Sequence, residues 1–452
     1  RTATVATPLA CGLYAWDRWY GAEVLSRNGR ALLAAGLITA DYKLNFRADQ
    51  PPEALSELHK RVAERVLRVC QRNGGLYIKF GQALALQSAV LPPEYNRVMQ
   101  VLLDDAPSVP YAQVEQILRE ELGQSPDELF LNFSHTPVAS ASIAQVHRAQ
   151  LSDGTQVAVK VQKPTIRPQM DWDLRAYALL TKFFEWAFEL PVSSFAETVQ
   201  DHLRQETDFI REGRNAEACA RAIQDEPRLR DRVYVPRIFW EHTAGRVLTA
   251  EWAEGRRLAD APALTEAGFD MAEAMRIMVD LFAHQIFVSG FVHCDPHPGN
   301  LLVRQDPRRS RGKPMLVLLD HGLYVRCRPS FRQEQCRLWT ALFTNDHEAL
   351  RTVCEAWGIG DVTTFASATL MRPYRAGQSA AELSAPVQAR DVYALQMQAK
   401  ERARTVLANE QRIPYELVLV ARNMNMVRAC NQALGSPVNR IGVMADWAAR
   451  GL

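Results

Sequence analysis

The stretch that most constrains this chain is residues 291–303, which reads F-V-H-C-D-P-H-P-G-N-L-L-V. One short apolar run leads into it and another leads out, a pattern typical of a tight polar loop between two buried strands. Within the loop, Asp295 and Asn300 stand five positions apart. A carboxylate in such a loop can orient a hydroxyl proton, and a side-chain amide oxygen can bind a metal ion. The loop is therefore a candidate for chemistry, provided that its partners occur elsewhere in the chain.

Two further segments supply such partners. The apolar run 315–319 ends on Asp320-His321-Gly322, where an acid can bind the magnesium ion that bridges nucleotide phosphates. Upstream, residues 156–162 read Q-V-A-V-K-V-Q, an alternating strand in which Lys160 is placed to meet phosphate oxygens. The three signals follow one another in the order found in kinases. The sequence therefore predicts a kinase-like site for Mg²⁺ and ATP, or ADP.

The composition limits the classes of function. The chain has 452 residues, 47% hydrophobic and 23% charged, enough for two packed lobes and an extension. A net charge of +2 gives little attraction for nucleic acid, so no nucleic-acid binding is expected. Its eight cysteines are scattered, which favours free thiols in a reducing compartment; Cys294 is expected to be a small filler beside the site. No apolar run reaches the length of a membrane span, and nothing indicates the oligomeric state.

The first part of the chain is predicted to be a helical extension. Residues 52–100 follow a helical pattern interrupted by a glycine pair. Residues 3–44 carry several aromatic residues and leucines, which predicts a helix that lies on a bilayer or, as we favour, packs on the body. Because the chain begins at Arg1, a targeting peptide or an anchor could precede it. In the string K-F-G-Q, Lys79 and Gln82 stand at i and i+3 and share one helix face.

A hairpin built from small residues precedes the Lys160 strand. Residues 137–147 read P-V-A-S-A-S-I-A-Q-V-H, at the place where a glycine-rich loop ordinarily covers nucleotide phosphates. Alanine lacks the positive-φ freedom of glycine, so this loop should be stiffer and its amides should approach phosphate differently. The nucleotide-binding residues expected here are Ala139, Ser140, Ala141 and Ser142.

Acidic residues follow in a helical region. Residues 170–190 are predicted to be an inserted helix whose aromatic side chains pack in the core. The next segment is predicted to be one continuous helix carrying Glu206, Asp208 and Glu212. Asp208 and Glu212 are four apart and would share one face, with Glu206 on another. Glu212 is predicted to pair with Lys160.

The remaining pattern completes the fold prediction. An apolar helix over residues 270–289 should be buried and position the catalytic loop, and the chain beyond Gly322 is predicted to be helical. The class is α+β, a bilobal protein-kinase-like fold with a mostly helical C-terminal lobe. We expect a helical extension over residues 1–106, an N-lobe with a helical insert over 107–253, and a C-lobe over 254–452. Four polar residues near the end are interpreted as caps or lobe-bridging groups without chemistry: Arg422, Asn423, Asn425 and Arg428.

Taken together, the motifs resemble the UbiB, or aarF-domain-containing (ABC1), atypical kinases. The motifs that carry the resemblance are K-F-G-Q at 79–82, A-S-A-S-I-A-Q-V-H at 139–147, E-T-D at 206–208, H-C-D-P-H-P-G-N at 293–300 and D-H-G at 320–322. The runs 206–219 and 417–444 are most similar to the branch that contains the fifth animal member and its fungal relatives. The resemblance covers nearly the whole chain from about Glu53.

The resemblance implies roles for individual residues. The extension is expected to fold over the active site, where Lys79, from the motif that ends in Gln82, reaches Glu206 and Asp208. This regulatory contact would block the space that a protein substrate needs. The resemblance also implies that Asp320 and Asn300 bind Mg²⁺, that Asp295 is the catalytic-loop acid, and that Glu212 pairs with Lys160.

The resemblance implies a function as well. Family members are associated with ATP hydrolysis and with coenzyme Q and mitochondrial lipid homeostasis, and not with routine protein phosphorylation. The expected protein is thus a mitochondrial, membrane-associated ATPase whose partners include a membrane lipid or a quinone-like lipid. Ser140 departs from the alanine that is usual in the loop, which leaves the choice of ATP or ADP open. Cys294 stands where most protein kinases carry arginine, so control by a docked activation-loop phosphate is not expected.

Two other functions fit part of the pattern. Small-molecule kinases of the aminoglycoside or choline type share four residues at the same spacing, His293, Asp295, His297 and Asn300, although the K-x-G-Q and E-x-D motifs argue against them. A nucleotide-dependent pseudokinase scaffold is the other alternative. No missing residue forces a loss of chemistry, because the lysine, the acids and the asparagine are all present.

Overall fold

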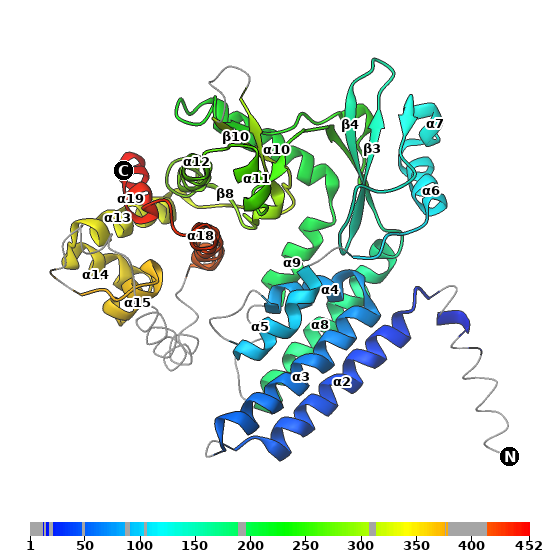
Figure 1. Cartoon of the computed structure of the whole chain (residues 1–452). Helices are drawn as coiled ribbons and strands as arrows, with labels where there is room; N and C mark the ends of the chain where they lie inside the picture. Colours follow the sequence, from blue (N-terminus) through cyan, green and yellow to red (C-terminus); the bar gives the residue numbers. More distant parts are fainter. Residues whose placement is uncertain are drawn as a thin grey trace. The chain divides into compact units, whose positions relative to one another are not determined.

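The computed structural model describes residues 12, 15–17, 21–47, 50–85, 91–103, 106–188, 196–306, 313–375, 377 and 414–452. Helices and short strands follow one another in an α+β order (Figure 1). The chain divides into two compact units: Arg1–Phe209 with Phe239–Thr249, and Ile210–Ile238 with Ala250–Leu452. Residues 210–238, which the predicted three-part division places in the N-lobe, thus group with the second unit, and that three-part division stays a prediction.

The first unit begins with a bundle of long helices. Its members are α2 (Val24–Asn45), α3 (Pro52–Asn73), α4 (Gly75–Ala85), α5 (Pro93–Met99), the 3₁₀ turn η1 (Gln100–Leu103) and α8 (Ile166–Phe188). Figure 1 shows α2 beside both α3 and α8, and these pairs are in contact. Helix α3 starts at a proline, whose fixed φ suits a first turn, and ends at Gly74 with φ +65°. The bundle agrees with the predicted helical extension.

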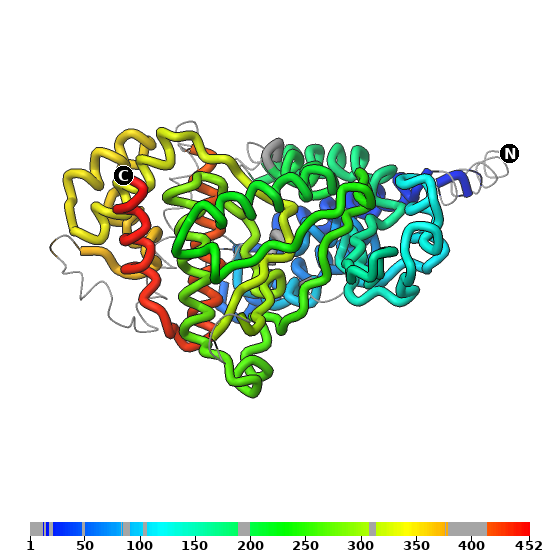
Figure 2. Tube along the Cα trace, turned by 90° about the horizontal axis from the view of Figure 1, so that it is seen from above, coloured from blue at the N-terminus to red at the C-terminus, as the bar shows by residue number. Residues whose placement is uncertain are grey.

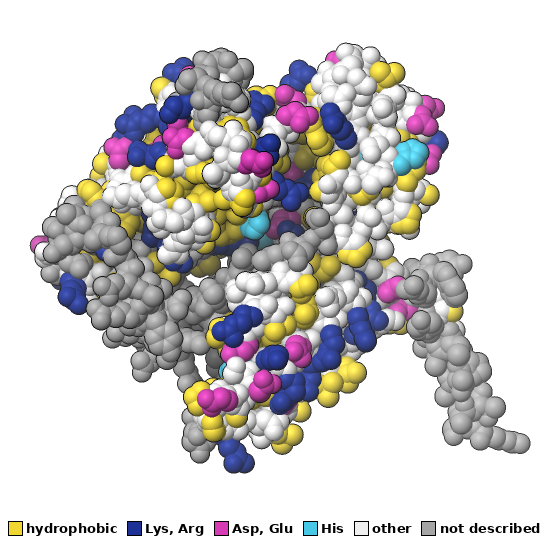
Figure 3. Space-filling model, in the orientation of Figure 1, with side chains coloured by type: hydrophobic (Ala, Val, Ile, Leu, Met, Phe, Trp, Pro, Cys, Tyr) yellow, Lys and Arg dark blue, Asp and Glu magenta, His cyan; other side chains and the backbone are white. Residues whose placement is uncertain are grey.

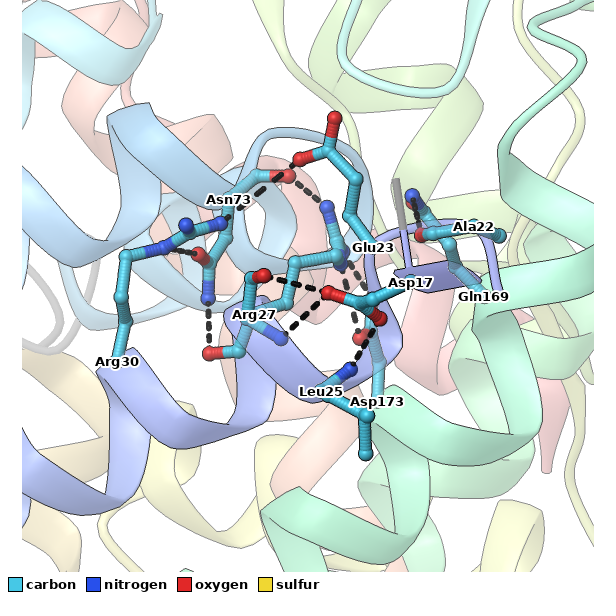
Figure 4. A network of polar contacts seen from close by, with 10 residues as sticks. Asp17, Ala22, Glu23, Leu25, Arg27, Arg30, Asn73, Gln169 and Asp173 are labelled. Atoms are coloured by element: carbon cyan, nitrogen blue, oxygen red, sulfur yellow. Dashed lines mark hydrogen bonds and ion pairs between the residues drawn. The ribbon is translucent and has the colours of Figure 1, made fainter. Parts of the chain in front are cut away.

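A buried polar network joins the helices of this bundle (Figure 4). Arg27 on α2 is 3% exposed, and its guanidinium donates to the carboxylate of Asp173 on α8 and to the carbonyl oxygen of Asn73. The side chain of Asn73 returns a hydrogen bond to the carbonyl of Arg27 at 3.0 Å. Burial raises the pKa of Asp173, and the neighbouring Arg27 opposes that rise. A charge removed from water in this way is tolerated only when its partner stays in place.

The sheet of the first unit carries the predicted hairpin. Its strands run in the order β1-β3-β4-β6, with β2 paired to β3. The strands are β1 (Asn132–Phe133), β2 (Ala139–Ser140), β3 (Ala144–Gln150), β4 (Gln156–Gln162) and β6 (Val247–Glu251). Val157, Val159 and Val161 of β4 are buried in one cluster with α6 (Tyr111–Leu122). Alternation along the strand therefore places Lys160 on the other face, as predicted. The short helix α7 (Pro126–Leu129) and the turn η3 (Trp240–His242) complete this part.

Of two predictions about the helices of this region, one is correct in part and the other is wrong. Phe184 of α8 packs against a buried cluster of the bundle, whereas Trp172 and Trp186 are 50% and 78% exposed and do not pack in the core. The predicted continuous helix is broken into α9 (Ala196–Glu206) and α10 (Phe209–Gln224). At the break, the hydroxyl of Thr207 donates to the carbonyl of Arg204 at 2.8 Å, and the Gln162 side chain occupies the Thr207 carbonyl at 2.9 Å. These bonds compete with the helical ladder.

The second unit holds two small sheets among helices. One sheet has the order β5-β10-β9-β7, and β8 pairs with β11 in the other. The strands are β5 (Val233–Tyr234), β7 (Arg256–Arg257), β8 (Phe291–His293), β9 (Leu301–Gln305), β10 (Pro314–Leu318) and β11 (Tyr324–Arg326). The short strand β11 interrupts the region predicted to be helical to the end.

The helices of the second unit make it mostly helical, as predicted. Besides α10 they are α11 (Ala261–Glu266), α12 (Met271–His284) with its π-helical continuation η4 (Gln285–Ser289), η5 (Pro298–Asn300), α13 (Pro329–Thr344), α14 (His347–Ala356), α15 (Val362–Leu370), α18 (Tyr415–Ala433) and α19 (Arg440–Gly451). Met275, Met278 and Phe282 of α12 are fully buried, which confirms the predicted core helix. Figures 1 and 2 show α19, in red, beside α13, in yellow, and the two helices pack together.

Candidate functional site

In the second unit, His293 organises the loop that carries Asp295. The His293 ring is buried, with Nδ1 at 2.9 Å from the backbone nitrogen of Asp295 and Nε2 at 2.8 Å from the carbonyl oxygen of Asp320. A backbone N–H can only donate, so Nδ1 is the acceptor and Nε2 carries the proton. Burial lowers the pKa of His293, against the opposing effect of Asp320 and Asp295, which favours this neutral form. The His293 imidazole thus bonds to the backbone of both predicted acids, Asp295 and Asp320.

Asn300 and Asp320 lie at neighbouring strand ends. Leu301 of β9 pairs with Leu318 of β10, and the backbone nitrogen of Leu319 donates to the carbonyl of Asn300 at 3.0 Å. Oδ1 of Asp320 accepts from the Gly322 nitrogen at 2.9 Å, which fixes the carboxylate in its turn. An amide oxygen and a carboxylate are the hard ligands that Mg²⁺ prefers, usually together with substrate phosphates. These two residues therefore fit the expected ion.

Helix α18 supplies two contacts that the sequence did not reveal. Asn423 is fully buried, and its side-chain nitrogen donates to the carbonyl of His293 at 2.6 Å. Arg422 lies 3.6 Å from Oδ1 of Asp295. From the sequence, these residues are interpreted as capping or lobe-bridging groups without chemistry, and the structure shows that both contact the loop that carries Asp295. Asn423 and His293 stand 130 positions apart, and no spacing rule connects α18 with the loop.

Cys294 is a structural residue in this loop. It is fully buried, and burial raises the pKa of its thiol to about 12. A thiol that stays protonated at neutral pH is a poor nucleophile. This agrees with the expected role of a small filler. Seven of the cysteines lie in the described part of the chain, and each is a buried free thiol.

In the first unit, the small-residue loop and Lys160 share one hairpin. Strand β2 pairs with β3 so that Ser140 faces Gln145, and β3 pairs with β4 so that Val146 faces Lys160. The loop between β2 and β3 includes Ala141 and Ser142, and with Ala139 these are the predicted phosphate-binding residues. The Nζ atom of Lys160 lies 5.1 Å from the centre of the Phe209 ring. The structure thus brings the predicted lysine and loop into one element, as the hairpin pattern predicts.

The hydroxyls in this loop are unusual. Ser140 and Ser142 are 9% and 3% exposed. Within the described residues, neither hydroxyl has a hydrogen-bond partner. A buried polar atom without a partner costs about 1–3 kcal/mol and calls for an explanation. The loop that is predicted to bind phosphate therefore contains two hydroxyl groups that can still donate a hydrogen bond.

Two residues of the K-F-G-Q motif have different roles: Lys79 forms an ion pair, and Gln82 fixes the position of helix α4. Nζ of Lys79 forms an ion pair with Oε2 of Glu206 at 2.8 Å, which agrees with the predicted contact. The side chain of Gln82 donates to the carbonyl of Leu102 at 2.7 Å. A methyl group added at Gly81 would clash with Cδ1 of Leu102 and crowd Sγ of Cys70, so a larger residue would force these side chains to move where α4 meets η1. Gln82 and the glycine dock the helix, and the lysine makes the outward contact.

Two predicted pairings remain predictions. Asp208 is exposed and stands in the break just before α10, while Glu212 lies in the first turn of that helix, so they do not share a face of one continuous helix. The contact of Lys79 with Asp208 stays a prediction. Glu212 is buried in the second unit and Lys160 belongs to the first, and their pairing also stays a prediction.

Comparisons with known proteins point in one direction. The model of the ABC1 atypical kinase-like domain matches residues 101–354. An ABC1 family protein of Schizosaccharomyces pombe is 39% identical over 438 residues, which are 97% of this chain and 81% of the relative. AarF domain-containing protein kinase 1 of Gallus gallus is 35% identical over 415 residues, 90% of this chain and 79% of the relative.

A solved structure shows the same fold. The Mycobacterium tuberculosis protein Rv3197, determined in a complex with erythromycin, is similar with a TM-score of 0.50 and 24% identity. The match covers 84% of this chain and 93% of that protein. This likeness and the matched domain confirm the predicted α+β, kinase-like fold.

Proposed function

Because this chain belongs to the ABC1 atypical kinase-like family, we propose that it is an atypical kinase-like ATPase that uses Mg²⁺ and ATP or ADP. The family predicted from the motifs is confirmed. Its branch within the family stays a prediction, since the Gallus gallus relative carries the name of kinase 1 rather than of the fifth member. The observation that carries the proposal is the His293 network, which fixes Asp295 and Asp320 on either side of one imidazole.

The residues have distinct parts in this proposal. Asp320 and Asn300 would hold Mg²⁺, which when bound offsets the negative charge on the nucleotide phosphates. Lys160 would bind phosphate oxygens. Asp295, held by His293 through its backbone and by Arg422 at its carboxylate, would orient a water molecule or an acceptor hydroxyl. The ion pair of Lys79 with Glu206 supports an extension engaged near the acids, which would favour a small or lipid acceptor over a protein.

Nucleotide titration tests this function directly. We expect ATP or ADP to raise the unfolding temperature in the presence of Mg²⁺ and not after its removal with a chelator, because binding only the folded state stabilises it. We also expect phosphate release from ATP. The absence of Mg²⁺-dependent stabilisation by either nucleotide would contradict the proposal. Binding without turnover would instead favour the pseudokinase scaffold, and turnover that needs an added soluble aminoglycoside or choline would favour the small-molecule kinase.

A lipid surface is the partner that we propose for the first unit. The outward face of α2 carries Leu25, Leu32, Leu33, Leu37 and Leu44, each between 44% and 75% exposed. Figure 3 shows apolar side chains along the lower edge of the bundle, where Figure 1 places α2. The outward positions between them are small residues, Gly29, Gly36 and Ala40. A helix with one apolar face and charged neighbours suits the plane of a membrane interface.

The neighbouring helix and the charges support the same partner. Helix α8 exposes Trp172 and Trp186, and tryptophan favours the membrane–water interface. Lys43, Arg175 and Lys182 are exposed on the two helices and would attract anionic headgroups. No described helix is both long and apolar enough to cross a membrane. On the basis of the family resemblance, we propose that this surface is a mitochondrial membrane and that the lipid is quinone-like or another membrane lipid.

Charges placed on this face should abolish vesicle binding. We expect the double variant Leu33→Glu, Leu37→Glu to bind vesicles of phosphatidylcholine and an anionic phospholipid at least about tenfold more weakly, because two leucines can no longer enter the interface. Sedimentation of the protein with vesicles measures the effect. The control pair Gln71→Glu and Gln113→Glu adds the same charge at exposed positions elsewhere. Equal binding by the leucine and control variants would contradict the proposed face.

A further inference from the structure

Lys163 is a buried ammonium group beside the small-residue loop. It follows the last residue of β4 and is 8% exposed. Its Nζ donates to the carbonyl oxygen of Ala141 at 2.5 Å and to that of Pro107 at 2.8 Å. Burial lowers its pKa to about 8. Lysine is seldom buried to this extent unless its charge is used. Neither the proposed chemistry nor the K-x-G-Q contact uses this residue.

The segment that arrives from the extension is fastened to the same loop. The backbone nitrogen of Ala106 donates to the carbonyl of Ser140 at 2.9 Å. The side chain of Gln145 accepts from the Val109 nitrogen at 2.8 Å and donates to the Val109 carbonyl at 3.3 Å. Lys163 adds the bond to Pro107. Residues 106–109 are therefore bonded to the hairpin at three positions, and Lys163 is the side chain that bonds the loop and this segment at once.

Peptide geometry gives the lysine a direct effect on the loop. The carbonyl of Ala141 and the N–H of Ser142 belong to one planar trans peptide and point in opposite directions. Because Lys163 holds that carbonyl, the N–H of Ser142 is directed away from the lysine. A loop without glycine has fewer backbone conformations to choose from, so one fixed peptide constrains its neighbours. The unpartnered hydroxyls of Ser140 and Ser142 belong to the same short segment.

We propose that Lys163 is a positioning residue for nucleotide binding, which fixes the Ala141–Ser142 peptide so that the Ser142 N–H and the Ser140 and Ser142 hydroxyls can donate to phosphate. This inference rests on the proposed function, because it takes the loop to be the phosphate-binding element. Lys163 acts through the loop and not by touching the ligand, because two of its three N–H donors bond to Ala141 and Pro107 and the side chain is buried. Nucleotide phosphate is the ligand class that backbone and hydroxyl donors of one short loop would recognise.

The test separates nucleotide binding from the chemical step. In Lys163→Met the apolar stem remains and the donors are lost, and we expect the Kd and KM for Mg²⁺ with ATP to rise about tenfold, with kcat changed by less than about threefold. Lys60→Met, at an exposed position of α3, is the matched control and should bind as the unaltered protein does. An unchanged Kd in folded Lys163→Met would overturn the inference.

The serine variants keep the inference testable if Lys163→Met fails to fold. Ser140→Ala and Ser142→Ala remove buried hydroxyls that have no partner, so the free protein should be as stable as before or more stable. Nucleotide affinity should nevertheless fall, by about five- to tenfold for the double variant. Greater stability with unchanged affinity would show that these hydroxyls do not meet phosphate and would overturn the inference. Absence of nucleotide binding by the unaltered protein would instead overturn the proposed function.

Discussion

Replacing Asp320 with asparagine is expected to abolish the Mg²⁺-dependent part of nucleotide binding. Asparagine keeps an oxygen that can accept from the Gly322 nitrogen, so the turn that follows β10 should persist. The negative charge that the ion needs is lost, and affinity should fall at least about a hundredfold. Calorimetric titration with ATP or ADP, in the presence and absence of Mg²⁺, measures this loss.

The control for this variant is another acid-to-amide change in the same unit. Asp446→Asn removes the exposed partner of Arg228, an ion pair of the kind that contributes about 0–1 kcal/mol. Its nucleotide affinity and the unfolding temperature of both free variants should match the unaltered protein. If Asp320→Asn retained full Mg²⁺-dependent binding, its assignment as a metal ligand would be wrong.

Replacing Arg27 with methionine is expected to lower the free energy of unfolding more than any other substitution that we propose. The change leaves Asp173, which is fully buried, without the guanidinium that pairs with it (Figure 4). Removing one partner of a buried ion pair costs roughly 3–5 kcal/mol. The midpoint of urea unfolding, followed by circular dichroism, should fall accordingly.

A second variant distinguishes the loss of the charge pair from the loss of packing. In the double variant Arg27→Met, Asp173→Leu no buried charge remains, and most of the stability should return. Arg119→Met, which breaks an exposed pair with Glu115, should cost about 1 kcal/mol or less. A single Arg27→Met variant as stable as the Arg119→Met control would show that the buried network contributes little.

Patterns along single strands predicted the parts of the site that those strands position. Alternation of valines placed Lys160 on the face opposite the core, and the apolar runs around residues 291–303 predicted the strands that hold Asp295 and Asn300. The K-x-G-Q motif predicted the contact of Lys79 with Glu206 through family resemblance. For the strands, the spacing of residues along one or two elements decides the geometry, whereas the contact of Lys79 came from the resemblance alone.

The failures came from contacts between distant parts of the chain. Helical periodicity predicted one helix through Thr207, but a side chain from β4 binds the Thr207 carbonyl and the helix breaks. The aromatic residues of α8 suggested a core, but Trp172 and Trp186 are 50% and 78% exposed. Arg422 and Asn423 were missed because only the fold brings α18 to residues 293–295. Sequence spacing carries no information on such encounters.

The contacts of α18 affect where a fragment that carries the candidate site should be cut. The family match ends at Cys354, and a fragment trimmed to that limit would contain every residue predicted to bind the nucleotide or the metal ion. It would lack Asn423, whose amide holds the His293 carbonyl, and Arg422, which lies beside the Asp295 carboxylate. A fragment that keeps both contacts must therefore extend beyond the boundary that family membership suggests, to at least Ala433 at the end of α18.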